Sequence, residues 1–355
     1  MSELIISGIQ QMGVGIPDVH QAWKWYREYF GVDIRIFEEA AVAALMLPYT
    51  GGEPRERHAA LAINLQGGGG FEIWQYRGRI PQPPAFQILP GDLGIYSCKI
   101  KCKDIKATHD FYLQKNAKVT PIYKDPSGSD FFYITDPYNN IFQVVKGNEW
   151  FSSGAFPTGG VYGAVIGVSD VEVSKKFYAD ILGYDTVVYD QTGNFEDMDQ
   201  LSAMPNQYRR VLLNHSKPRK GAFSKLLGPS QIELIQVIDR TPRKIFEGRF
   251  WGDLGFIHLC FDINGMDIMR AKCKLAGYPF TVDTSANSDT FDMGEAAGSF
   301  AYIEDPDGGL IEFVETHKLP ILKKIGWYLN LRKRNPEKAL PGWMLKALRF
   351  NRVKN

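Results

Sequence analysis

The sequence YIEDPDGGLIEFVE, residues 302–315, contains two strand-like stretches joined by an Asp-Pro-Asp-Gly turn. An earlier stretch, YITDPYNNIFQVV at residues 133–145, has the same frame, but it has Gln143 where the later copy has Glu312. A carboxylate between large apolar residues on a buried strand is costly unless it is paired or coordinated. The comparison therefore indicates an internal repeat and marks Glu312 as a candidate ligand.

A second repeated segment pairs an alternating apolar stretch with an amphipathic one. It occurs as MGVGIPDVHQAWKWYREYFGVDI at 12–34 and as AVIGVSDVEVSKKFYADILGYDT at 164–186. In both copies an Asp precedes the amphipathic stretch and a Gly follows it, which predicts a strand and then a capped helix of about three turns. Fainter copies at 94–112 and 256–280 extend the pattern. Each is followed by β-rich runs, so we expect four βαβββ modules at residues 1–82, 90–148, 158–240 and 250–317.

This module, with its PD-helix-FY-LG signature and DPDGG-x-IEF ending, resembles the vicinal oxygen chelate superfamily. That superfamily includes glyoxalase I, extradiol dioxygenases and bleomycin resistance proteins. The resemblance implies an α+β fold in which paired modules form cup-shaped half-barrels, and it is specific for the fold but not for the reaction. We expect a glyoxalase-like domain at 1–150, a second one at 151–317, and a basic helical tail at 318–355.

The resemblance also implies two ligand positions in each module, one on its first strand and one on its last. Counting back seven residues from each helix cap gives the first-strand positions Gln11, Ser97, Gly163 and His258. The last strands supply Glu72, Gln143, Glu233 and Glu312. Strand alternation turns Glu72 and Glu312 away from their apolar neighbours and toward the cup.

The pairing of modules decides which of these residues share a cup, and the sequence leaves two arrangements open. If neighbouring modules pair, His258 and Glu312 meet Gly163 and Glu233, and neither cup is complete. If the first and fourth modules pair, one cup collects the set Gln11, Glu72, His258 and Glu312, which one class of glyoxalase I uses. Such a set suits a divalent ion such as Zn, Ni, Co, Mn or Fe.

The resemblance implies a metalloenzyme that moves a proton on a small substrate with vicinal oxygens, as an isomerase or a lyase. Glu312 is then the candidate base and Glu72 its partner, with Trp74 and Tyr76 as pocket walls. The glutathione-binding pattern of glyoxalase I is absent. An extradiol-type dioxygenase is the first alternative, although it needs a second histidine at the position of Gly163. A metal-free binding protein is the other.

Composition limits the partners. The chain has 41 Lys and Arg against 40 Asp and Glu, so it has no overall field for nucleic acid. It begins with no signal-like segment, and we expect a cytoplasmic protein. The basic tail at 319–355 predicts two short amphipathic helices that pack on the chain or across a dimer, or else contact a membrane. Lys99 and Lys101 indicate either a basic cup or, as we slightly favour, a sheet edge. We expect His20 on a helix surface and His58 in a charged loop.

Overall fold

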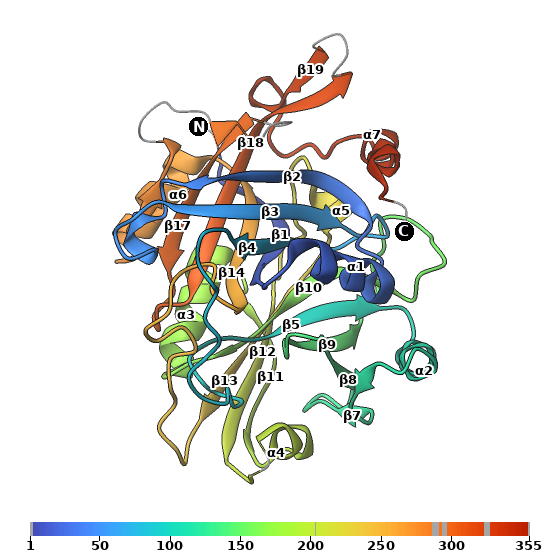
Figure 1. Cartoon of the computed structure of the whole chain (residues 1–355), viewed down its shortest axis with the longest axis vertical. Helices are drawn as coiled ribbons and strands as arrows, with labels where there is room; N and C mark the ends of the chain where they lie inside the picture. The colour runs from blue at the N-terminus through green and yellow to red at the C-terminus, as the bar shows by residue number, and fades with distance from the viewer. Residues whose placement is uncertain (1–2, 203, 286–290, 293–296, 323–326, 354–355) are drawn as a thin grey trace.

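The computed structural model describes residues 3–202, 204–285, 291–292, 297–322 and 327–353, and these form two curled β-sheets (Figure 1). The first module comprises β1 (Ile5–Gly15), α1 (Val19–Phe30), β2 (Ile34–Ala43), the 3-10 helix η1 (Leu47–Tyr49), β3 (Arg55–Ile63) and β4 (Gly70–Tyr76). The second comprises β5 (Gly94–Cys102), α2 (Ile105–Gln114), β6 (Lys118–Val119), β7 (Tyr123–Lys124), β8 (Asp130–Thr135) and β9 (Ile141–Lys146).

The third and fourth modules repeat this order. The third comprises β10 (Thr158–Gly167), α3 (Val171–Leu182), β11 (Thr186–Gly193), α4 (Glu196–Ser202), β12 (Tyr208–Asn214), α5 (Ser224–Leu227) and β13 (Gln231–Val237). The fourth comprises β14 (Gly255–Asn264), α6 (Met266–Leu275), β15 (Val282–Asp283), β16 (Phe291–Asp292), β17 (Ala297–Glu304) and β18 (Leu310–Leu322). The α+β fold and the four modules are confirmed.

The predicted helix caps explain why α1, α2 and α3 begin where they do. The carboxylates of Asp18, Asp104 and Asp170 accept hydrogen bonds from backbone N–H groups in the first turns of α1, α2 and α3. Gly31 and Gly183 end α1 and α3 with φ of 63° and 76°, a left-handed conformation that glycine adopts without steric cost.

The strands pair in the second of the two arrangements that the sequence left open, with the first module joined to the fourth. Sheet A has the order β15-β17-β18-β14-β1-β4-β3-β2 and so joins the first and fourth modules. Sheet B has the order β11-β12-β13-β10-β5-β9-β8-β6 and joins the second and third. At the centre of each sheet the two first strands pair antiparallel, β1 with β14 and β5 with β10. The sheets therefore do not follow the expected division of the chain at residue 150.

Sequence-adjacent modules are instead joined between the sheets by two matching hydrogen bonds. The hydroxyl of Tyr26 on α1 donates to Asp136 in the second module (2.8 Å), and that of Tyr178 on α3 donates to Asp305 in the fourth (2.9 Å). Both aspartates also accept backbone N–H groups of their own Asp-Pro turns. The repeated turn and the repeated helix tyrosine thus form one interaction, which occurs twice.

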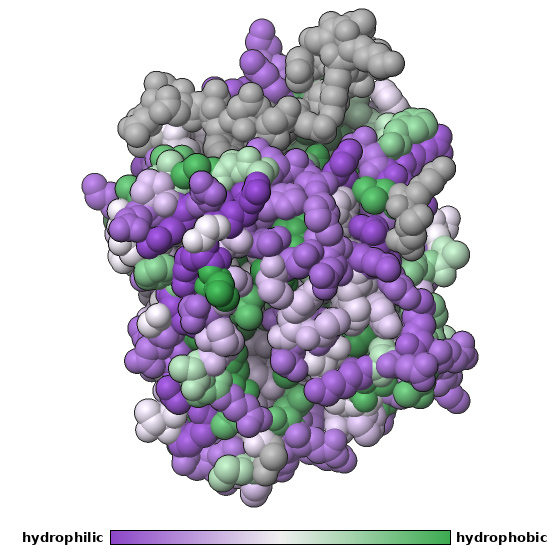
Figure 2. Space-filling view, viewed as in Figure 1, coloured by the Kyte–Doolittle hydropathy of each residue, from purple (hydrophilic) through white to green (hydrophobic). Residues whose placement is uncertain are grey.

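The largest hydrophobic core lies between the two sheets. It includes side chains from both of them, such as Phe71 of sheet A and Phe142 of sheet B, together with the inner faces of the helices. Figure 1 shows sheet A above sheet B, with α1 close to the level where they meet. On the face drawn in Figure 2, polar side chains predominate and apolar ones are scattered. None of the helices in the described part of the chain is long and apolar enough to cross a bilayer.

The tail differs in part from the expected pair of helices. Among its described residues, the tail first continues β18, which pairs with β19 (Trp327–Asn330), and then forms short helical segments at η4 (Leu331–Lys333), α7 (Gly342–Lys346) and η5 (Ala347–Asn351). Leu340 and Leu345 are buried in a hydrophobic cluster with Ile34 of β2 and Leu226 of α5. The tail therefore packs on its own chain, across the first and third modules.

Candidate metal centre

The four residues of the predicted set meet on the cup face of sheet A. β1 and β14 lie side by side and carry Gln11 and His258, while β4 and β18 flank them and carry Glu72 and Glu312. His258 is fully buried, and the other three are at most 9% exposed. We call this group of four residues cup A.

Distances within cup A show how closely the four side chains converge. His258 Nε2 lies 3.3 Å from Glu72 Oε2 and 3.1 Å from Glu312 Oε2. The Gln11 side-chain amide lies 3.3 Å from the same two oxygens. The described residues contain two groups of potential metal ligands. The buried group consists of Glu72, His258 and Glu312.

A glycine makes room for the imidazole. Gly13 lies directly opposite His258 in the strand pair, and a Cβ atom on it would lie 2.4 Å from Cε1 of the ring. Contacts under about 3 Å force a neighbour to move. The ring position therefore depends on the absence of a side chain at residue 13.

Burial and charge act on His258 in opposite directions. Burial alone would lower its pKa, but the negative charges of Glu312 and then Glu72 raise the pKa to about 9. Because an imidazole binds a metal only in its neutral form, an ion entering cup A would have to displace this proton.

The donor set of cup A fits a divalent ion. Ligand atoms at about 2.0–2.2 Å from an ion lie about 2.8–3.6 Å from their neighbours in octahedral or tetrahedral geometry. The distances from His258 Nε2 to the two carboxylate oxygens fall in that range. In addition, the buried Gln11 Oε1 has no hydrogen-bond partner among the described residues. An ion would satisfy this oxygen, and one nitrogen with three oxygens suits Zn, Ni, Co, Mn or Fe.

A cavity of about 300 Å³ opens beside the four side chains. Gln11, Glu72 and Glu312 form part of its lining, and the rest is mainly apolar or aromatic, including Phe37, Met46, Leu61, Trp251, Phe300 and Tyr302. This volume and lining are typical of a small-molecule site.

Of the described residues that line the cavity, Arg57 of β3 is the one with a cationic side chain. Its side chain is 9% exposed and forms an ion pair with Glu39 through Nη2. Its Nη1 is buried and has no hydrogen-bond partner among the described residues. This free donor is suited to a carboxylate or another oxygen of a ligand.

Part of the chain matches a known protein family. Residues 162–313 match the family described as Glyoxalase/Bleomycin resistance protein/Dioxygenase superfamily. The match assigns this segment, which spans most of the third and fourth modules, to the glyoxalase superfamily. No curated protein sequence matches it.

Solved structures share the fold of this chain over most of its length, and two of them are described here. Glyoxalase I from Zea mays has 15% identity and a TM-score of 0.52, covering 88% of this chain and 92% of that one. A structure titled putative dioxygenase from Bacillus subtilis has 14% identity and a TM-score of 0.52, covering 88% and 86%. At such identities the likeness concerns the fold alone.

The two expected pocket aromatics of this glyoxalase-like cup do not line the cavity. Trp74 is fully buried and packs edge-on against Tyr76 and Trp251, and the Tyr76 hydroxyl donates to the Trp251 carbonyl oxygen. Trp251 lies over them and forms the cavity wall in their place, with its ring nearly parallel to His258. The sequence prediction missed Trp251 and Arg57, because neither lies at a repeated position.

The equivalent face of sheet B, which we call cup B, carries Ser97, Gln143, Gly163 and Glu233, and Glu233 does not meet His258. Lys99 donates to Glu233 Oε2 (2.7 Å) and to Gln143, and Arg210 of β12 binds Glu233 Oε1 (2.6 and 2.9 Å). Arg210 also pairs with Asp197 of α4. Although burial pushes the pKa of Glu233 up, Arg210 and Lys99 hold it at about 2. Fixed cations thus neutralise the carboxylate that cup B retains.

The favoured placement of Lys99 and Lys101 at a sheet edge is wrong. β5 lies in the interior of sheet B between β10 and β9, and both lysines are at most 2% exposed. Lys99 lies in cup B, whereas Lys101 Nζ donates to the Glu149 carbonyl oxygen and lies over the Trp150 ring. Lys99 therefore matches the alternative interpretation, a basic cup, and Lys101 matches neither interpretation.

Proposed function

We propose that this protein is a divalent-metal-dependent enzyme that transfers a proton on a small substrate with vicinal oxygens, bound in the cavity beside cup A. The observation that carries the proposal is the convergence of Gln11, Glu72, His258 and Glu312 on one point at the wall of a cavity. When bound there, a divalent ion acts as a Lewis acid that stabilises negative charge on the substrate oxygens.

Side chains around the cavity would transfer the proton and bind the substrate. Glu312 lines the cavity and is placed to take a proton from the carbon next to a substrate carbonyl, and Glu72 faces it across cup A and can return the proton on the other side. Arg57 Nη1 supplies a charged donor for a carboxylate or second oxygen on the substrate. Trp251, Phe300 and Tyr302 exclude water and favour an apolar or aromatic substrate body.

The dioxygenase alternative is less well supported by the residues of cup A. A ferrous oxygenase site uses two histidines and one carboxylate, whereas cup A has one histidine and an amide at the position of the second. In cup B, a Cβ on Gly163 would lie 1.9 Å from the Gln231 carbonyl oxygen, so a histidine there would require the backbone to move. The metal-free alternative leaves the buried Gln11 Oε1 without a partner.

The proposal is tested by proton exchange, because the substrate need not be known in advance. The chain loaded with Zn, Ni, Co, Mn or Fe in turn is incubated in D₂O with a panel of 2-oxo and 2-hydroxy acids, and NMR follows the α-proton. Metal-dependent exchange that is lost in Glu312→Gln and weakened in Arg57→Gln supports the proposal. Oxygen consumption without exchange would favour the dioxygenase, and binding of panel members with neither reaction would favour the binding protein.

A further inference from the structure

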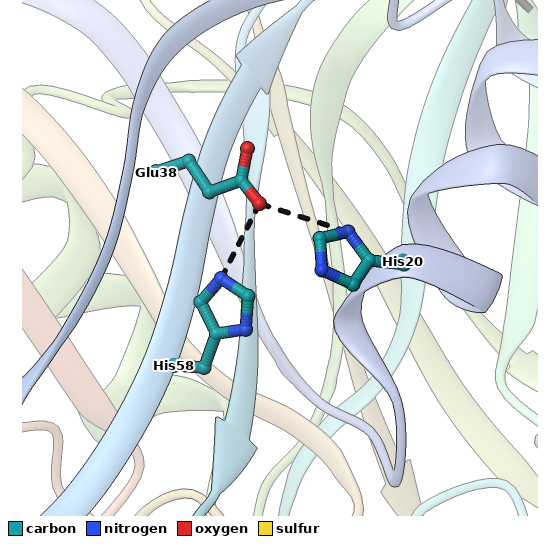
Figure 3. Close-up of side chains that lie close together, drawn as sticks. All are labelled: His20, Glu38 and His58. Carbon is teal, nitrogen blue, oxygen red and sulfur yellow. Dashed lines mark ion pairs between the residues drawn. The ribbon is translucent and has the colours of Figure 1, made fainter.

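A second cluster of metal-ligand side chains lies outside the cavity, at residues His20, Glu38 and His58 (Figure 3). Glu38 Oε1 is 3.3 Å from His58 Nε2 and 3.6 Å from His20 Nδ1. The two imidazole rings lie edge to face with centroids 5.1 Å apart. Figure 3 shows both rings turned toward the same carboxylate.

Three separate elements of the first module bring these residues together. His58 on β3 alternates with Arg57, which lines the cavity, so it faces the opposite side of sheet A. Its register partner on β2 is Ala40, which places Glu38 two residues away on the same face. His20 belongs to the first turn of α1. The expected charged loop at His58 is therefore a strand.

The first turn of α1 is held at this place by the neighbouring strand. The backbone N–H of Val19 donates to the side chain of Gln75 on β4 (3.0 Å), and Gln75 is the register partner of His58. Asp18 caps the same turn. The three donor atoms therefore lie on ordered backbone rather than on long loops, which is what a metal site requires.

Spacing and orientation also fit an ion. Neighbouring ligands of a tetrahedral ion with bonds of about 2.0–2.1 Å lie about 3.3–3.4 Å apart. The distances of 3.3 and 3.6 Å from Glu38 Oε1 to the two imidazole nitrogens are close to this value. Arg35 lies near the other carboxylate oxygen, with Nη1 3.5 Å from Oε2, so Oε1 alone is directed between the two imidazoles. The His20 side chain is 71% exposed, which leaves room for water as a fourth ligand.

We propose that His20, Glu38 and His58 bind a zinc-class divalent ion that fastens the first turn of α1 to β2 and β3. This site is independent of cup A, because it lies on the opposite face of sheet A and shares no residue with it. Its role is to hold the helix rather than to activate a substrate, since no cavity residue belongs to it.

Counting zinc equivalents tests the site without any activity assay. The full chain is stripped with a chelator and titrated with Zn²⁺ against a chromophoric competitor, in parallel with His20→Asn, His58→Asn, Glu38→Gln and His258→Ala. His109→Asn serves as the control, because His109 is a helix histidine outside both clusters, with Nε2 2.8 Å from the Thr120 carbonyl oxygen.

We expect two equivalents in the wild type and in His109→Asn. His20→Asn, His58→Asn and Glu38→Gln should each lose one equivalent, or weaken it at least 10-fold, and His258→Ala should lose the other. Zinc should raise the Tm of His258→Ala but not that of the double variant with His58→Asn. The proposed site is wrong if His20→Asn, His58→Asn and Glu38→Gln all bind zinc with the stoichiometry and affinity of the wild type. A wild type that binds one equivalent, which is lost in His20→Asn but retained in His258→Ala, would contradict the proposed function and leave this site standing.

Discussion

Gly13 is the residue on which the position of the His258 imidazole depends. The ring occupies the space where a side chain at residue 13 would lie, directly across the β1–β14 strand pair. The absence of a side chain at residue 13 therefore sets the position of one ligand in the candidate metal centre. A substitution at residue 13 should therefore change the metal affinity of cup A more than it changes the free energy of unfolding.

We predict that Gly13→Ala weakens divalent-metal binding in cup A by at least 10-fold, because the added Cβ pushes His258 away from Glu72 and Glu312. Competition titration with Zn²⁺ in the Glu38→Gln background measures the affinity of cup A alone. Gly193→Ala is the matched control, since a Cβ there meets nothing within 4 Å. Unchanged affinity in Gly13→Ala would show that His258 is not a ligand.

The sequence was informative at this scale where a residue occupies a repeated position. Counting from helix caps predicted Gln11 and His258, and strand alternation predicted Glu72 and Glu312, all of which the fold brings together. Arg57 lies on a third strand and Trp251 in a loop, where the repeat gives no register. His20, Glu38 and His58 were missed because their contact depends on how α1 lies on the sheet.

At the scale of single elements, β5 and α4 distinguish cup B from cup A. β5 places Lys99 against Glu233, and α4 adds Asp197 against Arg210, so that two cations and two carboxylates are buried together. The charges of these four groups balance within the protein. Cup B is therefore a structural ion-pair core, which explains why one copy of the repeated hairpin retains no ligand at Gln143.

We predict that Glu233→Gln destabilises the chain by about 3–5 kcal/mol at neutral pH, because it leaves Lys99 and Arg210 buried with one carboxylate. The pKa of Glu233 is about 2 in the folded chain and about 4.3 in an unfolded one. Its stabilising contribution is therefore complete above about pH 4.3 and is lost as the pH falls through about 2.

Urea unfolding at a series of pH values measures this difference. The gap in the free energy of unfolding between wild type and Glu233→Gln should stay constant above about pH 4.3 and narrow below it. Glu172→Gln, which alters an exposed ion pair with Arg209, should show little difference at any pH. A gap that widens on acidification would contradict the ion-pair account of cup B.

At the scale of the whole molecule, the two sheets each need both halves of the chain. β1 of the first module lies against β14 of the fourth, and β5 of the second against β10 of the third. The number of modules could be predicted from the sequence, because it depends on local patterns. Their pairing could not, since both arrangements bury the same strand faces and differ only in long-range contacts.

We predict that residues 1–150 do not fold alone, because the isolated fragment exposes the central strands β1 and β5 as unpaired edges. Co-expression with residues 151–355 should give a 1:1 complex with the far-UV circular dichroism and the zinc stoichiometry of the intact chain. A monomeric, cooperatively folding 1–150 fragment would show that neighbouring modules pair in solution.

The tail belongs to the packed structure rather than to a free surface. Leu340 is fully buried between residues of the first and third modules, and the Leu340 backbone N–H donates to the Ala222 carbonyl oxygen. Leu340→Ala should therefore lower the free energy of unfolding by about 2–5 kcal/mol in urea titrations. Trp343→Ala, at a residue that is 67% exposed, should change it by less than about 0.5 kcal/mol. Equal effects would mean that the tail is not docked in this way.

The most direct test of the central claim is a crystal structure of the chain soaked with Zn²⁺ or Co²⁺, with anomalous scattering measured at the metal edge. Metal binding by the four residues predicts a peak in cup A, about 2.0–2.2 Å from His258 Nε2 and from oxygens of Gln11, Glu72 and Glu312. A saturated crystal with no anomalous peak among these four residues, or with the ion held in cup B, would contradict it.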